Sequence, residues 1–255
     1  KQTLFFLFLF FSLCRLYGQE TAFSNFITRD GDKLMDGKTV FRFISVNTPN
    51  INGHYDGYKN TNPESGYIYD PVELSYEMEA HFKDMVQMGV TVIRTWGITV
   101  EDGKGEFEAL VTGPYSYNEN AFRRIDKMLE LCNKYNIRVI LCLVKENKYW
   151  GGTGAFSKLY GGGDYYEDPT VKEGFKDLLK TMVNRENHYT GVSYKDDKAI
   201  LAWEFGNEVP NNEVAWIAEM ANYLKDIDQN HLIADPRRAN GVKQMKKIVD
   251  DVLND

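Results

Sequence analysis

The residues Ala199-Ile-Leu-Ala-Trp-Glu-Phe-Gly-Asn-Glu208 form a nearly apolar run that ends in polar side chains. A short, continuous apolar run bounded by Gly and Pro is typical of a strand that is buried on both faces of a parallel sheet. Pro210 and a helical pattern over residues 213–228 follow this run. The segment therefore predicts one strand, a polar strand end and one helix.

The same unit recurs along the chain. Apolar strand patterns cover residues 41–47, 91–97, 138–144 and 231–235, and helical patterns cover 74–88, 121–135, 170–184 and 242–253. Two short β segments, 26–29 and 33–35, flank Asp30-Gly-Asp32 and predict a small N-terminal hairpin. We expect an α/β protein of the (β/α)8 TIM-barrel type, incomplete, with about five β/α units. A doubly wound sheet would need a glycine-rich phosphate turn after its first strand, and Asn47-Thr-Pro-Asn-Ile51 is not one.

The long loops follow strands, whereas the connections that return from the helices are short. Barrel enzymes place their sites on the side of the long loops. The strand ends there present Asn47, Arg94 with Trp96, Lys145 with Glu146, and Asn207 with Glu208. A carboxylate held at a strand end beside an amide suits general acid–base work at an ether oxygen. The alternative is a solvent-exposed Glu208 ahead of a turn at Pro210.

Composition excludes several other classes of protein. The chain has 255 residues, 43% hydrophobic and 26% charged, which excludes a disordered or fibrous protein. Its 30 Lys and Arg against 37 Asp and Glu give a net charge of −7, without the basic excess of a nucleic-acid binder. The sequence contains no CxxC motif and no Cys/His cluster, so it predicts no metal site. Cys132 and Cys142 fit either a disulfide or two buried thiols.

The N-terminus has the pattern of an export signal. Lys1 precedes the apolar run of residues 4–11, and Gly18 supplies a small residue before Gln19. The run is too short to cross a membrane. We expect a signal peptide at 1–18, a barrel domain at 19–255, and a secreted or periplasmic protein. A lipoprotein anchored at Cys14 is the less favoured alternative, because the preceding Phe-Ser-Leu fits a lipobox poorly.

Three segments resemble glycoside hydrolase family 5, in particular its endo-β-1,4-mannanase branch. They are Thr91-Val-Ile-Arg-Thr-Trp-Gly97, the stretch from 166–169 through 189–197, and the run that ends at Asn207-Glu208. Their order and spacing agree with the family over roughly residues 38–235. The Asn-Glu ending is specific to the family when it follows a Trp-Glu pair on the fourth strand.

The resemblance implies a role for each strand-end residue. Glu208 would be the general acid and then the base, and Asn207 would hold the sugar hydroxyl next to the scissile bond. Arg94 would support the nucleophilic carboxylate, with its pairing to a buried Glu204 as the structural alternative. Substrate-binding candidates are Asn47, Trp96, Tyr149 and Trp150, although Tyr149 and Trp150 could instead pack the loop.

Three departures from the family pattern are visible. Lys145-Glu-Asn147 stands where mannanases usually have Asn-Asn-Trp, and Val209 displaces the Pro that normally follows the acid/base. The family's nucleophile lies on the seventh strand, which this chain does not reach. The nearest later carboxyl groups are Glu213 and Glu219, in a helical pattern, and Asp235, in an Asp-Pro turn.

We therefore expect a retaining glycosidase that cleaves β-1,4-linked polysaccharide, of the mannan endo-1,4-β-mannosidase type. The expected partner is a polysaccharide or oligosaccharide, with no cofactor, no metal, no nucleic acid, and no membrane after signal cleavage. The 255-residue segment by itself is expected to be inactive, because its nucleophile lies beyond it. A non-catalytic carbohydrate-binding relative, a β-glucanase or cellulase, and a transglycosylase remain open alternatives.

Overall fold

The computed structural model describes residues 22–52, 71–104, 108–146, 148, 150–239, 241 and 243–247, and for 71–75 the backbone alone. The expected signal peptide at 1–18 and the candidate Tyr149 lie outside the described residues. The fifth helix, expected over 242–253, is described as helical at 243–247. None of the helices in the described ranges is long and apolar enough to cross a membrane.

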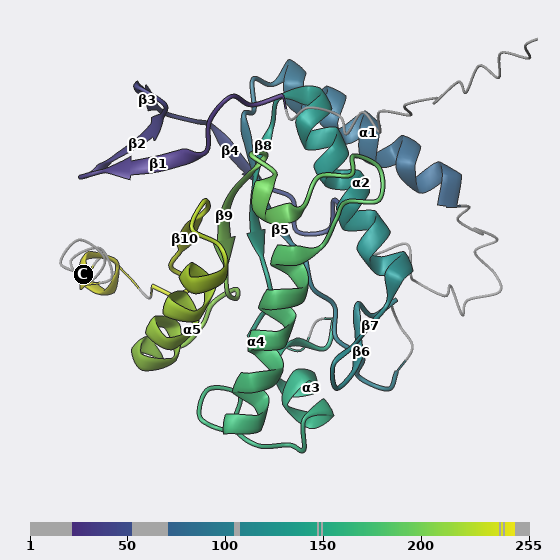
Figure 1. Ribbon diagram of the computed structural model, residues 1–255, viewed down its shortest axis with the longest axis vertical. Coiled ribbons are helices and arrows are strands. Elements are labelled where there is room, and N and C mark those ends of the chain that lie inside the picture. The colour runs from purple at the N-terminus through teal and green to yellow at the C-terminus, as the bar shows by residue number, and fades with distance from the viewer. Residues whose placement is uncertain are drawn as a thin grey trace, which may run out of the picture.

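The centre of the molecule is a five-stranded parallel sheet (Figure 1). Its strands are β4 (Ser45–Asn47), β5 (Val92–Trp96), β8 (Arg138–Cys142), β9 (Ile200–Glu204) and β10 (Leu232–Ala234). They lie side by side in chain order, and every neighbouring pair is parallel. A doubly wound sheet would reverse its strand order at a switch point, so this sequential order is that of a barrel. The expected incomplete barrel of five units is confirmed.

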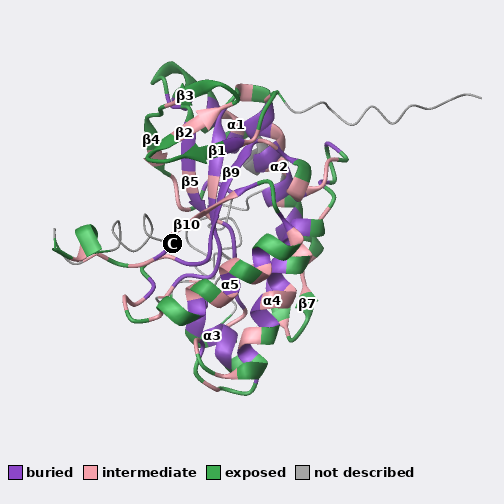
Figure 2. Cartoon of the chain, turned by 60° about the vertical axis from the view of Figure 1, so that its left-hand side comes forward, coloured by how far each residue is buried: buried purple, intermediate pink, exposed green. Residues whose placement is uncertain are grey.

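Helices cover one face of this sheet. They are α1 (Pro71–Gln87), α2 (Glu119–Tyr135), α4 (Pro169–Asn184) and α5 (Val214–Ile227). The main core lies between sheet and helices, and the strand residues facing it include Ile93, Val139, Leu141, Ile200 and Trp203. The middle strands β5, β8 and β9 are mostly buried, and the helices expose their outer faces (Figure 2). Continuous apolar strands of this kind are what a helix-covered parallel sheet requires.

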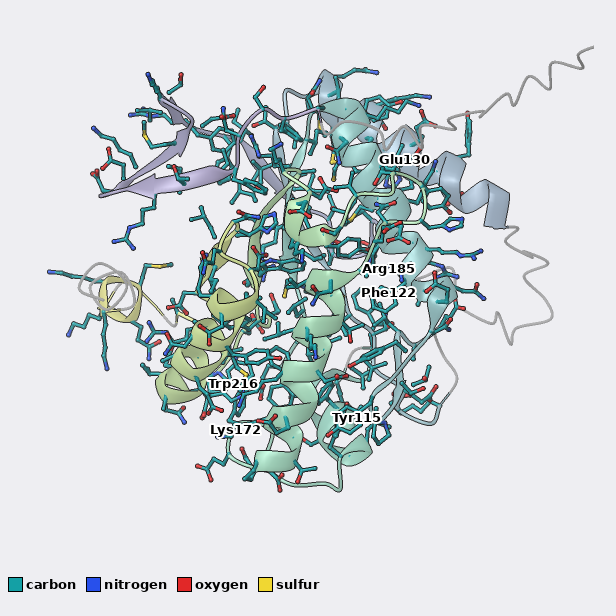
Figure 3. All side chains as sticks on the ribbon, in the orientation of Figure 1. Tyr115, Phe122, Glu130, Lys172, Arg185 and Trp216 are labelled. Carbon is teal, nitrogen blue, oxygen red and sulfur yellow. The ribbon has the colours of Figure 1, made fainter. Side chains whose placement is uncertain are left out.

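The helix ends follow the sequence signals. Asp168 caps α4 by accepting hydrogen bonds from the backbone N–H groups of Thr170 and Val171, and Pro169 takes the first helical position. Asn136 ends α2 in the left-handed conformation, at a φ of 55°. Arg185, after α4, pairs with Asp126 of α2, and its guanidinium lies 4.3 Å from the Phe122 ring (Figure 3). This contact fixes α4 against α2.

A small antiparallel sheet covers the N-terminal ends of the central strands. It consists of β1 (Ile27–Asp30), β2 (Lys33–Asp36) and β3 (Thr39–Phe41) in that order. The expected hairpin is present, and β3 adds a third strand to it. The first barrel strand is correspondingly shorter than the expected 41–47. Ile27, with Leu34 and Phe41, packs against Val92 and Ala202 on the inner face of the barrel.

Two elements were not expected from the sequence. The helix α3 (Gly152–Leu159) lies within residues 145–168, where only a loop was predicted, and a hairpin of β6 (Val111–Gly113) and β7 (Ser116–Tyr117) follows β5. Glycines at 151, 152 and 154 lower helix propensity and hide the helical pattern of α3. The helix is stabilised by burial of Ala155 and Phe156 rather than by propensity.

Cys132 and Cys142 are both buried and free. The two-thiol alternative therefore holds, and the disulfide alternative is wrong. Cys132 is a residue of α2 that faces the main core, and Cys142 ends β8. Burial raises the pKa of both thiols, so both stay protonated and behave as small apolar groups.

Candidate active site

The carboxyl ends of four neighbouring strands bring the polar candidates together. In the strand register, Asn47 of β4 lies opposite Arg94 of β5. Trp96 of β5 lies opposite Cys142 of β8, and Cys142 in turn lies opposite Glu204 of β9. Alternate residues of a strand point to the same face, so Asn47, Arg94, Trp96 and Glu204 share the inner face of the barrel. The predicted convergence of strand ends is therefore present for these elements.

Arg94 contacts most of the other polar residues in this group. Its Nε lies 2.6 Å from Glu204 Oε2 and its Nη2 lies 2.8 Å from Glu204 Oε1, a bidentate ion pair. Nη2 also donates to Asn207 Oδ1 at 2.9 Å, and Nη1 donates to Asn47 Oδ1 at 3.3 Å. The structural alternative for Arg94, a pair with Glu204, is thus realised. The same guanidinium also orients two further site candidates.

The electrostatics of the pair follow from its burial. The Glu204 side chain is 9% exposed and that of Arg94 is 23% exposed. Burial alone would lower the pKa of Arg94, but the hydrogen bonds and the charge of Glu204 outweigh it and hold this pKa above its ordinary value. The site therefore keeps a fixed positive group with one edge directed to Asn47 and Asn207.

Glu208 lies directly beyond this network and is exposed. Its φ of 63° is left-handed, which is uncommon for a residue with a side chain and occurs at functional sites more often than elsewhere. Hydrogen bonds fix the backbone around it: Glu146 N donates to Asn207 O at 3.1 Å, and Val209 N donates to Pro236 O at 3.0 Å. The Glu208 carboxyl group is therefore exposed on a fixed stretch of backbone, where a bound group can reach it.

Gly206 allows this strand end to approach its neighbour. A Cβ at position 206 would lie 2.6 Å from the carbonyl oxygen of Val144, closer than real Cβ atoms come. Leu143 N donates to Glu204 O at 2.7 Å, so the segments after β8 and β9 remain joined beyond the regular strands. Within the Phe-Gly-Asn-Glu ending, the second position must therefore be glycine, because any side chain there would clash with Val144.

Two indole rings form one wall of the site. The rings of Trp96 and Trp150 meet edge to face, with centroids 5.3 Å apart. Trp150 O accepts a hydrogen bond from Val100 N at 2.9 Å, and Trp150 has a φ of 55°. Both residues are half-buried, so part of each remains exposed to solvent. Aromatic faces of this kind stack on apolar ligand faces.

The departure Lys145-Glu146 introduces groups that the sequence reasoning did not assign. Lys145 is buried, with its Nζ 4.0 Å from the Trp96 ring centroid and 4.8 Å from the Trp150 ring centroid. Glu146 accepts hydrogen bonds from the hydroxyl of Tyr166 and from Thr153 Oγ1, the latter at 3.3 Å. The unusual residues after β8 were the sequence signal for both contacts.

The carboxyl groups after Glu208 are engaged elsewhere. Asp235 is paired with Arg237, whose Nη2 lies 2.7 Å from Asp235 Oδ2. Glu219 lies on α5 and pairs with Lys172 of α4, and Glu213 immediately precedes α5. Among the residues that the structure describes, no group of three or more His, Cys, Asp or Glu is arranged to hold a metal ion.

A parallel barrel sheet with polar residues converging at the carboxyl ends of its strands is the arrangement of a barrel enzyme, and comparisons with known proteins give the family. A family model described as "GH family 5 beta-mannosidase-like" matches residues 157–251. Putative mannan endo-1,4-beta-mannosidase 4 of Arabidopsis thaliana is 30% identical over 234 residues, 85% of this chain and 53% of that protein. Mannan endo-1,4-beta-mannosidase 1 of Oryza sativa subsp. japonica is 39% identical over 160 residues, 57% of this chain and 36% of that protein.

Solved structures agree with these relatives. The endo-1,4-beta-mannanase of Rhizomucor miehei superimposes with a TM-score of 0.69 at 25% identity, over 86% of this chain and 64% of that one. An endo-beta-1,4-mannanase of Thermotoga petrophila superimposes with a TM-score of 0.65 at 26% identity, over 79% of this chain and 45% of that one. These matches place the chain in glycoside hydrolase family 5, in the mannanase branch. It spans about half the length of the first of these curated relatives and about a third of the second.

Proposed function

We propose that the whole protein is a retaining glycoside hydrolase that cleaves β-1,4-linked mannan within the chain. The relatives named above are mannan endo-1,4-β-mannosidases and endo-mannanases. The observation on which the proposal chiefly rests is the Arg94 network. One guanidinium joins Glu204, Asn207 and Asn47 directly beside Glu208.

Each residue has a distinct role in this reaction. Glu208 donates a proton to the leaving oxygen and then, as a carboxylate, removes one from the attacking water. Asn207 donates a hydrogen bond from its amide nitrogen to the sugar hydroxyl beside the scissile bond, while its oxygen accepts from Arg94. A glutamate beyond Asp255 attacks the anomeric carbon, and the Arg94 guanidinium supports its negative charge. Retaining enzymes hold their two carboxyl groups about 5–5.5 Å apart.

The substrate lies along the indole wall. Trp96 and Trp150 present aromatic surface for the apolar faces of the sugar rings, and the exposed Asn47 offers its amide nitrogen to a hydroxyl group. Tyr149, which lies outside the described residues, remains a substrate-binding candidate from the sequence alone. Lys145-Glu146 replaces two amide side chains, so we infer that the sugar preference near this loop differs from that of relatives with Asn-Asn-Trp.

The protein is proposed to be secreted or periplasmic, with residues 1–18 removed on export. The support is the charged residue, the apolar run and the small residue before Gln19. N-terminal sequencing of the mature protein tests this. A first residue near Gln19 is expected, whereas an intact Lys1 in the mature protein, or a lipid on Cys14, would contradict the assignment.

Hydrolysis assays on defined polymers test the activity. The full-length protein should release oligosaccharides from unsubstituted β-1,4-mannan, and the 255-residue segment should release none. Release from β-glucan alone would make the protein a cellulase or β-glucanase. Binding without hydrolysis by the full-length protein would make it a carbohydrate-binding relative, and elongation of added oligosaccharides would make it a transglycosylase.

A further inference from the structure

Lys145 occupies an unusual place for a lysine. The residue is 1% exposed and follows β8 at the mouth of the barrel. A lysine that only fills space normally extends its ammonium group to water. Here the Nζ instead lies 4.0 Å from the centroid of Trp96 and 4.8 Å from that of Trp150.

The two indoles belong to different elements, and Lys145 bridges them. Trp96 ends β5, whereas Trp150 precedes α3 in the loop after β8. Lys145 O also accepts a hydrogen bond from Thr153 N of α3 at 2.9 Å. A cation over an aromatic face is attracted by the ring quadrupole, and more strongly where water is excluded. The ammonium group therefore holds both rings at once.

The same ammonium group is electrostatically linked to the acid/base candidate. Burial lowers the pKa of Lys145 to about 8, while the negative charge of the Glu208 carboxylate acts in the opposite direction. Of the other charged groups at these strand ends, Arg94 and Glu204 form their own ion pair, and Glu146 accepts hydrogen bonds from Tyr166 and Thr153. At neutral pH Lys145 is therefore a cation that interacts with Glu208.

We propose that Lys145 is a positioning residue of this site: its ammonium group clamps Trp96 and Trp150 into one sugar-binding wall. The inference builds on the proposed function, because the wall and the acid/base matter only for a bound glycan. It adds a residue that stands where the family pattern has an amide. The clamp is lost when Lys145 is deprotonated or replaced by an apolar residue.

The clamp is tested without substrate by a pH titration of tryptophan emission in the full-length protein. Wild type should show a transition near pH 8 that Lys145→Met abolishes. Lys148→Met removes an exposed lysine of the same loop and should keep the transition. Lys145→Arg keeps a cation that does not titrate in this range, so it should give a flat trace near pH 8. A wild type without the transition, or a Lys145→Met variant that retains it, would overturn the clamp.

A binding assay with mannopentaose then connects the clamp to the site, with Glu208→Gln introduced into wild type and every variant so that the ligand is not hydrolysed. Lys145→Met should weaken binding about 3- to 10-fold, as expected for loss of a partly desolvated cation–π contact, and Lys145→Arg should restore most of it. If Lys145→Met does not fold, wild type and Lys145→Arg still decide the spectroscopic test. Unchanged affinity in both variants would refute the clamp, whereas absence of mannopentaose binding by wild type would refute the proposed function and leave the spectroscopic result standing.

Discussion

Arg94 and Glu204 form a bidentate ion pair across β5 and β9, with N–O distances of 2.6 and 2.8 Å. The pair lies at the strand ends, and the same guanidinium reaches Asn207 at 2.9 Å. A buried pair of this kind contributes little net stability, because desolvation of both charges offsets their attraction. Its value lies in fixing the guanidinium relative to the residues that would contact the sugar.

Replacing one partner of this ion pair should therefore lower the free energy of unfolding far more than replacing both partners. We predict that Arg94→Met destabilises the protein by about 3–5 kcal/mol, because Glu204 is left buried and unpaired. The double variant Arg94→Met/Glu204→Met should recover most of that loss but none of the hydrolytic activity. Denaturant unfolding and mannan hydrolysis measure the two effects. A double variant that regains activity would reduce Arg94 to a structural partner of Glu204.

Gly151 is required for the approach of the Trp150 loop to Val100, in the segment after β5. It has a φ of 85°, and a Cβ there would lie 2.0 Å from Val100 O. Gly151→Ala should destabilise the protein by at least about 1–3 kcal/mol and weaken oligosaccharide binding. Gly154→Ala is the matched control, since Gly154 lies in α3 with no atom within 4 Å of its Cβ position. It should leave stability unchanged or raise it by up to about 1 kcal/mol. Equal effects of both changes in urea unfolding would contradict this account.

Asp228 anchors a buried network below the site. It accepts hydrogen bonds from Trp203 Nε1 at 2.8 Å and contacts His231 Nδ1 at 2.7 Å. Burial alone would raise the pKa of Asp228, but the contacts with His231 and Trp203 lower it below its ordinary value. A depressed carboxyl pKa contributes stability above the unfolded pKa and loses it as the pH falls through the folded one.

We therefore predict that Asp228→Asn lowers the free energy of unfolding at pH 7 by about 1–3 kcal/mol. The difference from wild type should shrink as the pH falls below about 4, the ordinary range of an aspartate. Asp226→Asn, an exposed change at the end of α5, should stay within about 0.5 kcal/mol of wild type. If the stability difference between wild type and Asp228→Asn instead grew as the pH fell, the predicted link between the lowered Asp228 pKa and stability would be wrong.

The fold was predictable because each strand of the sheet is a nearly apolar run between turn residues. The end of α2 at Asn136 and the start of α4 at Asp168-Pro169 were visible for the same reason, since both are local signals. The helix α3 was missed because its glycines suppress the local pattern and only the burial of Phe156 stabilises it. Such tertiary stabilisation does not appear in a local reading of the sequence.

The site was predictable as a set of strand ends but not as a network. Position along the strands indicated that Asn47, Arg94 and Asn207 would meet, because the ends of parallel strands share one edge. The contacts of Lys145 with two indoles depend on the path of the loop after β8. That path is set by Gly151 and α3, both of which depend on contacts distant in sequence.

The acid/base assignment makes a prediction about leaving groups. In the full-length protein, Glu208→Gln should slow mannan hydrolysis by about 10²–10⁴-fold, the usual contribution of general acid–base catalysis. Bond cleavage in an activated aryl mannoside should slow far less, because its leaving group needs little protonation. Rates on both substrates measure this contrast. Equal loss on both would contradict a proton-donating role for Glu208.

The most direct test of the central claim is the product formed by full-length Glu208→Ala from an activated aryl β-mannoside in the presence of azide. Azide needs no general base, so it can intercept a covalent mannosyl-enzyme when the acid/base carboxylate is missing. The expected product is β-mannosyl azide, formed with net retention and with a faster turnover than without azide. Formation of α-mannosyl azide would make Glu208 the nucleophile, and an unchanged rate without any azide product would contradict its role as the acid/base.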